Sequence, residues 1–183
     1  RSAMEKGKGH GGIVCFVPSK AFLECFKTIF TQQIDQKLPY HFEDLKSFER
    51  DCRTRSTVLF SVMGGRLSEG INFSDNFCRM LFVIGLPFPS MTTEINERIK
   101  FYGKNFLVNI AMKTVNQSLG RALRHKNDFA SIVLIDQRYE NHIEMLSPWI
   151  QEKIKKSIFQ DVFKQTHSFL KEQTEKYFNS KQK

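Results

Sequence analysis

The chain has 183 residues, with 28 Lys plus Arg against 19 Asp plus Glu, and 40% of its residues are hydrophobic. This length is sufficient for one domain with a substantial core, and the mixture of apolar and charged residues excludes a disordered, collagen-like or low-complexity chain. Most of the net charge of +9 comes from residues 91–130 and 150–183. Basic stretches of this kind are typical of nucleic-acid or phosphate binders, and they are equally typical of a solvated helix face.

The cysteines are far apart in the sequence. They are Cys15, Cys25, Cys52 and Cys78, and no two of them form a CxxC pair. Zinc sites and iron–sulfur clusters need closely spaced thiolates, so we expect no metal site in this chain. We predict reduced, mostly buried thiols of an intracellular protein rather than a disulfide. No apolar stretch approaches the roughly 18 residues of a membrane span, so we expect no membrane partner.

Short apolar runs alternate with amphipathic stretches along the chain. The runs at 13–17, 58–62, 80–84 and 132–135 predict buried strands. The helices that we expect cover residues 20–30, about 42–55, a stretch from about 93, and a stretch through 110–123. Ser19 is the expected N-cap of the first helix. Strands that alternate with helices predict an α/β fold, with a mostly parallel sheet and helices on both faces.

The last part of the chain predicts a helical C-terminal extension. Ser147 and Pro148 form an N-cap followed by a first-turn proline. An aromatic stripe runs from Phe159 to Tyr177 at helical spacing, and we expect it to pack against the domain rather than to form a partner site. The organisation that we predict is a disordered or cloning-derived leader at residues 1–10, the α/β domain at 11–150, and the extension at 151–183, packed on the same domain.

Polar segments follow three of the predicted strands, at 18–20, 64–73 and 136–139. Ligands of parallel α/β sheets collect at the carboxyl ends of the strands, where loops and helix N-termini present unpaired N–H groups. The Gly64-Gly65 pair would allow backbone amides to approach a phosphate. A structural turn explains a Gly-Gly pair equally well.

The strongest local pattern is QSLGRALRHKND at residues 117–128. On a helix, Arg121 and Arg124 would project from one face, and two guanidinium groups on one face suit a polyphosphate. The alternative is a solvated basic turn paired with Asp128. A glycine inside a helix costs roughly 1 kcal/mol, so Gly120 favours close approach of a ligand or a packed neighbour. The sequence contains no Walker-type loop, so the chain would hold only half of a shared nucleotide site.

The pattern QxxGRxxR at 117–124 resembles motif VI of superfamily 2 helicases, and residues 62–73 resemble their motif V in its XPD-like form. The strand at 13–17 with Ser19 would be motif IV. The longer strings GGRLSEGINFSDNFCRMLFVIGLPFP and VNQSLGRALRHKNDFASIVLIDQRY are similar to the chromosome-loss (ChlR) branch of the XPD-like iron–sulfur DNA helicases. The resemblance covers nearly all of residues 11–150, with three motifs in the family's order.

This resemblance implies the second, RecA-like motor lobe of an ATP-dependent DNA helicase that moves 5′ to 3′. The first lobe of the same polypeptide would supply the Walker loop, the Mg²⁺ site and the domain with the 4Fe–4S cluster. The implied ligands are ATP with Mg²⁺ and single-stranded or forked DNA. The implied setting is DNA repair, replication or chromosome cohesion in the nucleus, with replication or cohesion proteins as further partners.

The resemblance also implies roles for individual residues. Arg121 and Arg124 would reach the γ-phosphate across the cleft between the lobes, with Arg124 as the principal arginine finger. Gln117 would orient the nucleotide or the attacking water. Gly70 and Asn72 would lie beside the ribose and phosphates, and many family members have Asp at the position of Asn72. The residues that would hold DNA phosphates are Ser19, Gly64, Gly65, Arg66 and Ser68.

The competing interpretation is a non-catalytic basic module that binds nucleic acid or a protein through its C-terminal helices. A pure binding module does not need two arginines that face an empty cleft, so the motif VI pattern favours the helicase lobe. If the chain is a helicase lobe, we expect it to be inactive as an ATPase without the first lobe.

Overall fold

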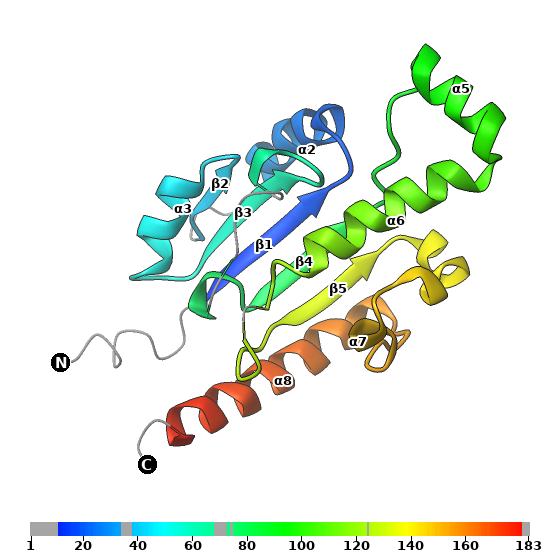
Figure 1. The fold of residues 1–183 in the computed structure, drawn as a ribbon. Helices are drawn as coiled ribbons and strands as arrows, with labels where there is room; N and C mark the ends of the chain where they lie inside the picture. Colours follow the sequence, from blue (N-terminus) through cyan, green and yellow to red (C-terminus); the bar gives the residue numbers. More distant parts are fainter. Residues whose placement is uncertain (1–10, 34–37, 68–72, 74, 124, 181–183) are drawn as a thin grey trace.

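The computed structural model describes residues 11–33, 38–67, 73, 75–123 and 125–180 of the chain (Figure 1). Its centre is a five-stranded sheet in which every strand pairs in parallel with its neighbours, in the order β2-β3-β1-β4-β5. The strands are β1 (Gly12–Val17), β2 (Tyr40–Phe42), β3 (Thr57–Val62), β4 (Met80–Ile84) and β5 (Ser131–Ile135). The four apolar runs of the sequence are thus confirmed as strands. The predicted leader lies outside the described residues.

Helices lie on both faces of this sheet, and α5 (Thr93–Tyr102) projects from it (Figure 1). The other helices of the described residues are α2 (Lys20–Gln33), α3 (Leu45–Cys52), α6 (Asn105–Leu119), α7 (Pro148–Gln151) and α8 (Phe159–Ser180), and short 3-10 segments form η1 (Asp75–Phe77), η2 (Gln137–Asn141) and η3 (Ile143–Met145). Within the described ranges, no helix is both long and apolar enough to pass through a bilayer.

Two apolar clusters hold the helices on the sheet. On one face, Leu23 and Phe26 of α2 pack with Phe60 of β3. On the other face, the larger cluster joins α3 and α6 to the central strands, with Phe48 and Val115 among its fully buried members. Because the central strands are covered on both sides, they are continuous apolar runs rather than alternating ones. The predicted α/β architecture with helices on both faces is confirmed.

The segment expected to form one helix over about 42–55 contains two elements. Residues 40–42 form the edge strand β2, which pairs with β3. Helix α3 begins only at Leu45, where the Asp44 side chain caps it by accepting a hydrogen bond from the Ser47 N–H at 3.1 Å. The sequence pattern missed β2 because three residues are too few to show a period of two.

Helix α8 lies along β5 and extends away from it (Figure 1). Its contact is narrow: Thr166 is buried and its hydroxyl lies 3.1 Å from that of Ser131 on β5. The expectation that its aromatic stripe packs against the domain is wrong for three positions. Phe159, Phe163 and Phe169 are 71%, 46% and 36% exposed, because one strand edge covers only one side of a long helix. The boundaries between leader, domain and extension stay a prediction.

A buried ion pair fixes the loop before β5 to the start of β4. Arg79 Nη1 lies 2.8 Å from Asp128 Oδ1, and their side chains are 10% and 0% exposed. The same Arg79 nitrogen donates to the Phe129 carbonyl at 2.7 Å, and the guanidinium lies 4.1 Å from the centroid of the Phe129 ring. Because the Arg79 guanidinium is buried, removal of the Asp128 carboxylate would strongly lower the free energy of unfolding.

We therefore expect Asp128→Ala to lower the free energy of unfolding by about 3 to 5 kcal/mol, because it leaves the Arg79 guanidinium buried without its counter-charge. Urea unfolding followed by circular dichroism measures this loss. The matched control is Glu172→Ala, which breaks an exposed pair with Lys176 on α8 and should cost at most about 1 kcal/mol. Equal losses in the two variants would contradict the assignment.

The cysteines are free thiols in different environments. Cys15, Cys52 and Cys78 are buried, whereas Cys25 is exposed on the outer side of α2. The prediction of mostly buried thiols is thus confirmed with Cys25 as the exception, because Leu23 and Phe26 are the residues of this helix that meet the sheet. Burial raises the pKa of both Cys15 and Cys52 to about 12.

Only Cys25 should react rapidly with a thiol reagent such as dithionitrobenzoate at pH 8, because the thiolate is the reactive form and burial suppresses it in the other three. The native protein should release about one equivalent of thionitrobenzoate, and the denatured protein all four. Cys25→Ser should remove the fast phase. A fast phase that survives this substitution would show that the buried positions are accessible.

Candidate functional site

The segment after β3 and the end of α6 meet on the face of the sheet that α3 and α6 cover. The Phe73 N–H donates a hydrogen bond to the Arg121 carbonyl at 3.1 Å. The Phe73 ring is buried between Phe16 of β1 and Phe48 of α3, with ring centroids 6.4 and 6.1 Å away. Two segments that are far apart in the sequence, each expected to carry site residues, are therefore joined through their backbones.

The turn after β3 brings the Gly64-Gly65 pair to the carboxyl edge of the sheet. Gly64 has φ +69°, which favours glycine, and a Cβ atom there would lie 3.2 Å from the Thr114 methyl group of α6. The Gly65 N–H donates to the Val62 carbonyl at 3.1 Å, so the turn itself uses this amide. The exposed Arg66 follows directly and brings a positive charge to this edge.

Ser19 lies on the neighbouring strand at the same edge. Val17 of β1 and Val62 of β3 are paired in register, so Ser19 and Gly64 each follow the same rung of the sheet by two residues. Ser19 Oγ accepts a hydrogen bond from the Phe22 N–H at 3.1 Å, which confirms the predicted N-cap of α2. The hydroxyl hydrogen of Ser19 stays available for an acceptor such as a phosphate oxygen.

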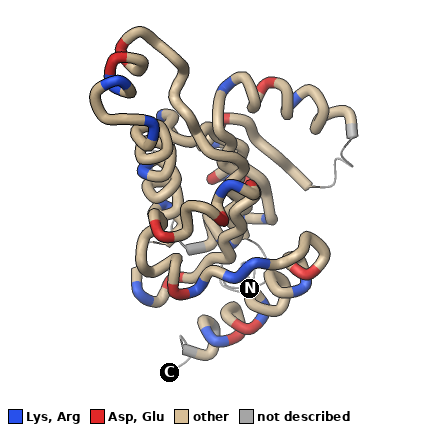
Figure 2. Tube along the Cα trace, turned by 90° about the vertical axis from the view of Figure 1, so that its right-hand side faces the viewer, with Lys and Arg blue, Asp and Glu red and all other residues tan. Residues whose placement is uncertain are grey.

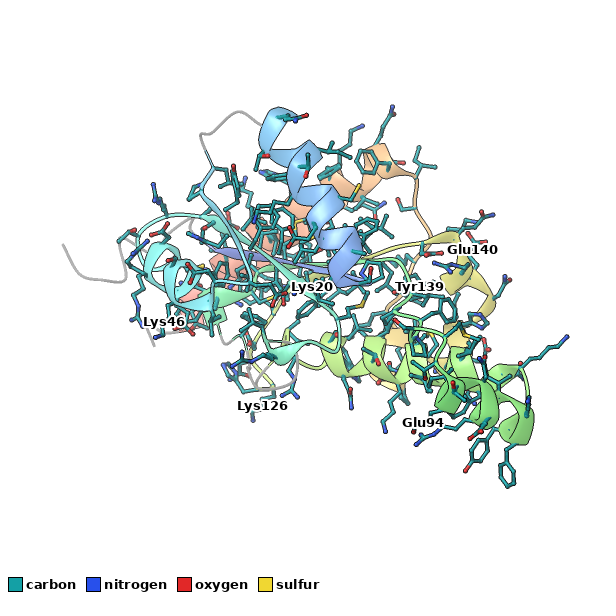
Figure 3. All side chains as sticks on the ribbon, turned by 90° about the horizontal axis from the view of Figure 1, so that it is seen from above. Lys20, Lys46, Glu94, Lys126, Tyr139 and Glu140 are labelled. Carbon is teal, nitrogen blue, oxygen red and sulfur yellow. The ribbon has the colours of Figure 1, made fainter. Side chains whose placement is uncertain are left out.

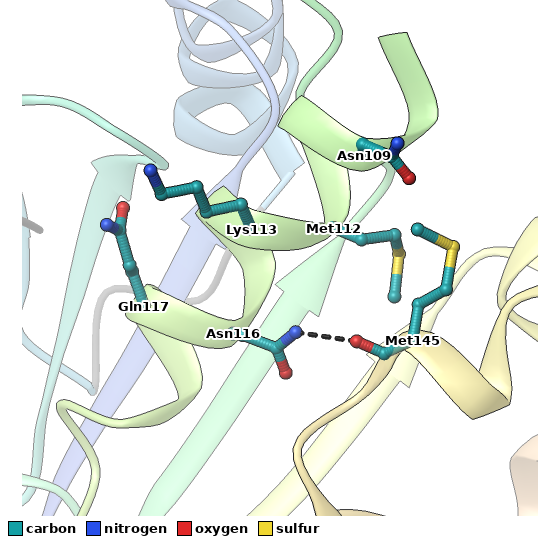
Figure 4. A pocket seen from close by; sticks show the side chains of 6 residues that line it. All are labelled: Asn109, Met112, Lys113, Asn116, Gln117 and Met145. Carbon is teal, nitrogen blue, oxygen red and sulfur yellow. Dashed lines mark hydrogen bonds between the residues drawn. The ribbon is translucent and has the colours of Figure 1, made fainter. Parts of the chain in front are cut away.

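Helix α6 presents Gln117 on its exposed side, together with a residue that sequence reasoning missed. Lys113 lies one turn before Gln117, and Figure 4 shows both side chains directed toward the segment after β3. Lys113 forms no ion pair with any residue that the structure describes. The spacing of four residues from Gln117 was the available signal, since residues i and i+4 share one side of a helix.

Asn116 fixes the orientation of this helix from its other side. Its amide nitrogen donates to the Met145 carbonyl at 2.8 Å, the contact drawn in Figure 4. Its amide oxygen accepts from the Ser147 N–H at 2.8 Å and from the Ser147 hydroxyl at 3.1 Å. With Asn116 held by the segment before α7, the adjacent Gln117 faces outward.

The expectation that Arg121 lies on a helix is wrong. Helix α6 ends at Leu119, and Gly120 is its C-cap, with an N–H bonded to the Asn116 carbonyl at 3.0 Å. Arg121 is half-buried in the turn that follows, at the residue whose carbonyl receives the Phe73 N–H. Gly120 thus stands at a helix end rather than in a helix interior, with a φ of −64° that any residue can adopt. Arg124, Ser68, Gly70 and Asn72 lie outside the described residues.

The polar segment after β5 is used within the fold. The Asp136 carboxylate accepts from Arg138 Nε at 2.9 Å, and this hydrogen bonding holds the pKa of Asp136 below its usual range. The Arg138 guanidinium also lies 5.3 Å from the centroid of the Phe88 ring. Tyr139 is buried and donates to the Gly85 carbonyl at 2.7 Å. These contacts tie the end of β5 to the end of β4.

The charged residues of α6 and of the turn after it are all positive. No Asp or Glu lies between Glu97 and Asp128 in the sequence, a stretch that includes Lys113 and Arg121. Figure 2 shows Lys and Arg along this part of the chain. An anion that approaches the exposed side of α6 therefore meets a positive potential.

No group of three or more His, Cys, Asp or Glu side chains suitable for a metal ion occurs in the part of the chain that the structure describes. Cys15 lies in β1 and Cys25 on the outer side of α2, so the thiols do not converge as a 4Fe–4S cluster would need. The described residues of the candidate site supply cations, backbone amides and hydroxyls.

The chain is similar in sequence to known proteins, including the three below, and similar in fold to two solved structures. The chain is 36% identical to the ATP-dependent DNA helicase chl-1 of Caenorhabditis elegans over 189 residues, which cover 90% of this chain and 23% of that protein. It is 37% identical to ATP-dependent DNA helicase CHL1 of Saccharomyces cerevisiae over 176 residues, 79% of this chain and 20% of that protein. It is 32% identical to ATP-dependent DNA helicase DDX11 of Mus musculus, and the match covers 90% of this chain and 22% of that protein. The chain thus spans about a quarter or less of these relatives.

Two solved structures share the fold at low sequence identity. One, titled XPD_Helicase, has a TM-score of 0.55 and 21% identity, and the match covers 75% of this chain and 27% of that one. The other, titled XPD_APO, has a TM-score of 0.57 and 20% identity, and the match covers 76% of this chain and 31% of that one. The family described as helicase C-terminal domain matches residues 3–153 of this chain. With that match over most of its length, and with the segments after β3 and at the end of α6 joined on one face of a parallel sheet, the chain belongs to the helicase C-terminal domain family.

Proposed function

We propose that this chain is the second motor lobe of an ATP-dependent 5′-to-3′ DNA helicase, whose nucleotide site is completed by the first lobe of the same polypeptide. The observation that carries the proposal is the hydrogen bond between the Phe73 N–H and the Arg121 carbonyl. It joins the segment resembling motif V to the segment resembling motif VI, which are the parts expected to contact ATP with its Mg²⁺. The three relatives are named ATP-dependent DNA helicases, which supports the same activity for this chain.

In this proposal, Arg121 and Arg124 stabilise the negative charge that develops on the transferred γ-phosphoryl group, with Arg124 as the principal finger. Gln117 orients the nucleotide or the attacking water, and Gly70 and Asn72 contact the ribose and phosphates. Lys113, one turn from Gln117, adds a further cation on the same side of α6. Fixed cations in a closed, dry cleft are more effective than the same charges in water.

The DNA-binding part of the proposal uses the carboxyl edge of the sheet. Ser19 and Arg66 follow neighbouring strands there, beside the Gly64-Gly65 turn, and Ser68 continues the segment. Phosphate contacts of this kind carry little sequence preference, so the substrate is single-stranded or forked DNA rather than a particular sequence. The same proposal includes a role in the nucleus, in DNA repair, replication or chromosome cohesion. The proteins of those processes would be its partners.

The alternative of a non-catalytic basic module has one supporting observation. The exposed Phe159 and Phe163 of α8 could contact another protein. The alternative does not explain why the two motif-bearing segments converge beside Gln117, and the catalytic experiment below separates the two interpretations.

Catalysis should depend on Arg124 in the full-length protein and should be absent from the 183-residue chain. We expect Arg124→Ala to lower ATP turnover on the order of 10³-fold with a much smaller effect on ATP binding, because the finger acts on charge that develops in the transition state. Arg124→Lys should restore little, since an ammonium group does not reproduce the planar guanidinium. Turnover and nucleotide affinity are measured separately by steady-state kinetics and by titration with a fluorescent ATP analogue.

The control for this experiment is Arg53→Ala, which removes an exposed arginine beside Phe77 and should leave turnover unchanged. ATP hydrolysis by the 183-residue chain alone, or full activity of the Arg124→Ala enzyme, would refute the motif VI assignment.

Binding of single-stranded DNA by the chain should be weak and should fall steeply with salt, because phosphate contacts release condensed counterions. Removal of one phosphate-binding cation should reduce the slope of log affinity against log salt by about 0.7 for a single strand. We expect this change for Arg66→Ala, and none for Lys176→Ala, whose ammonium pairs with Glu172 on α8. Fluorescence anisotropy with labelled oligothymidine measures both slopes, and an affinity that does not change with salt would argue against a phosphate-binding edge.

A further inference from the structure

Helix α5 projects beyond the carboxyl ends of β1 and β4 (Figure 1), and Figure 3 shows it leaving the body of the molecule from Glu94 onward. None of its residues is buried. Both of its ends are capped. Thr92 accepts a hydrogen bond from the Ile95 N–H at 3.2 Å, and the Gly103 N–H donates to the Ile99 carbonyl at 2.8 Å. A helix of this length is marginal by itself, so its caps and its contact with α6 hold it in place.

The last turn of α5 carries two adjacent aromatic side chains in solvent. Phe101 is 82% exposed and Tyr102 is 64% exposed. The Tyr102 ring stacks on Phe106 of α6, with centroids 5.3 Å apart and an angle of 16° between the planes. The Phe101 and Tyr102 rings form an edge-to-face pair, with centroids 4.8 Å apart and an angle of 79° between the planes. Because Phe101 is 82% exposed, its ring offers an open face on which another planar ring can stack.

The charges around this pair favour a nucleic acid over a protein. Lys100 and Lys104 flank the two rings, are exposed, and form no ion pair within the described part of the chain. Of the two acidic residues of α5, Glu94 pairs with Arg98 and Glu97 lies one turn before Phe101, and no acidic residue follows in the sequence until Asp128. Lysine is depleted in protein–protein interfaces, whereas sites for single-stranded nucleic acid combine cations for the backbone with aromatic rings for the bases.

We propose that Phe101 and Tyr102 form a base-stacking site for single-stranded DNA, with Lys100 and Lys104 at the flanking phosphates. The proposal rests on the proposed function and extends it, because the edge with Ser19 and Arg66 would hold only the DNA backbone. Stacking restrains the bases themselves as the strand leaves that edge. Since every base has a π-face, the site imposes no sequence preference.

The experiment compares two probes on the 183-residue chain. One is single-stranded oligothymidine, and the other is an oligonucleotide of equal length made of abasic sites, which keeps the phosphates and removes the bases. We expect the double variant Phe101→Ala with Tyr102→Ala to bind oligothymidine roughly 5- to 100-fold more weakly and the abasic probe unchanged. The salt slope should stay the same, because no charge is removed.

Three further variants separate stacking from other causes. Tyr102→Trp keeps an aromatic face and should retain the affinity for oligothymidine, while Tyr102→Leu keeps only apolar surface and should not. Phe159→Ala removes a similarly exposed ring from α8 and should have no effect. Circular dichroism of each variant checks that the fold is intact.

Several outcomes would overturn the inference. Unchanged affinity of the double variant for oligothymidine would show that the rings face a protein instead of DNA. An equal decrease on both probes would show that the variant disturbs phosphate binding rather than stacking. These results differ from a failure of the proposed function, in which the unmodified chain binds neither probe.

Discussion

The hydrogen bond from the Phe73 N–H to the Arg121 carbonyl is the contact on which the candidate site depends. It forms because the Phe73 ring is buried between β1 and α3, which leaves the backbone of Phe73 facing the end of α6. A buried amide requires an acceptor, and the turn after Leu119 supplies one. The core packing of a single phenylalanine thus sets the distance between the two motif-bearing segments.

A second group of contacts keeps this arrangement rigid without taking part in it. Asn116 ties α6 to the segment before α7, and the buried pair of Arg79 and Asp128 ties the loop after α6 to β4. The turn that contains Arg121 is therefore anchored on both sides. Under the proposed function this rigidity would matter, since an arginine finger is effective only when its position is preorganised.

The surfaces left uncovered have different chemistry. Helix α5 ends in exposed aromatic rings between lysines, at the carboxyl edge of the sheet. Helix α8 exposes Phe159 and Phe163 at a distance from that edge, beyond its narrow contact with β5. The two surfaces therefore lie on different parts of the molecule (Figure 1).

The sequence by itself determined the parallel sheet, the cap at Ser19 and the family, because strands buried on both faces are continuous apolar runs and the motif spacings are specific. Only the tertiary structure decided the edge strand β2, the end of α6 at Leu119 and the exposure of Cys25. It also placed Lys113 beside Gln117 on the open side of α6. The physical reason is that a local pattern reports which residues are apolar, whereas the end of a helix and the exposure of a side chain depend on the neighbouring elements that cover them.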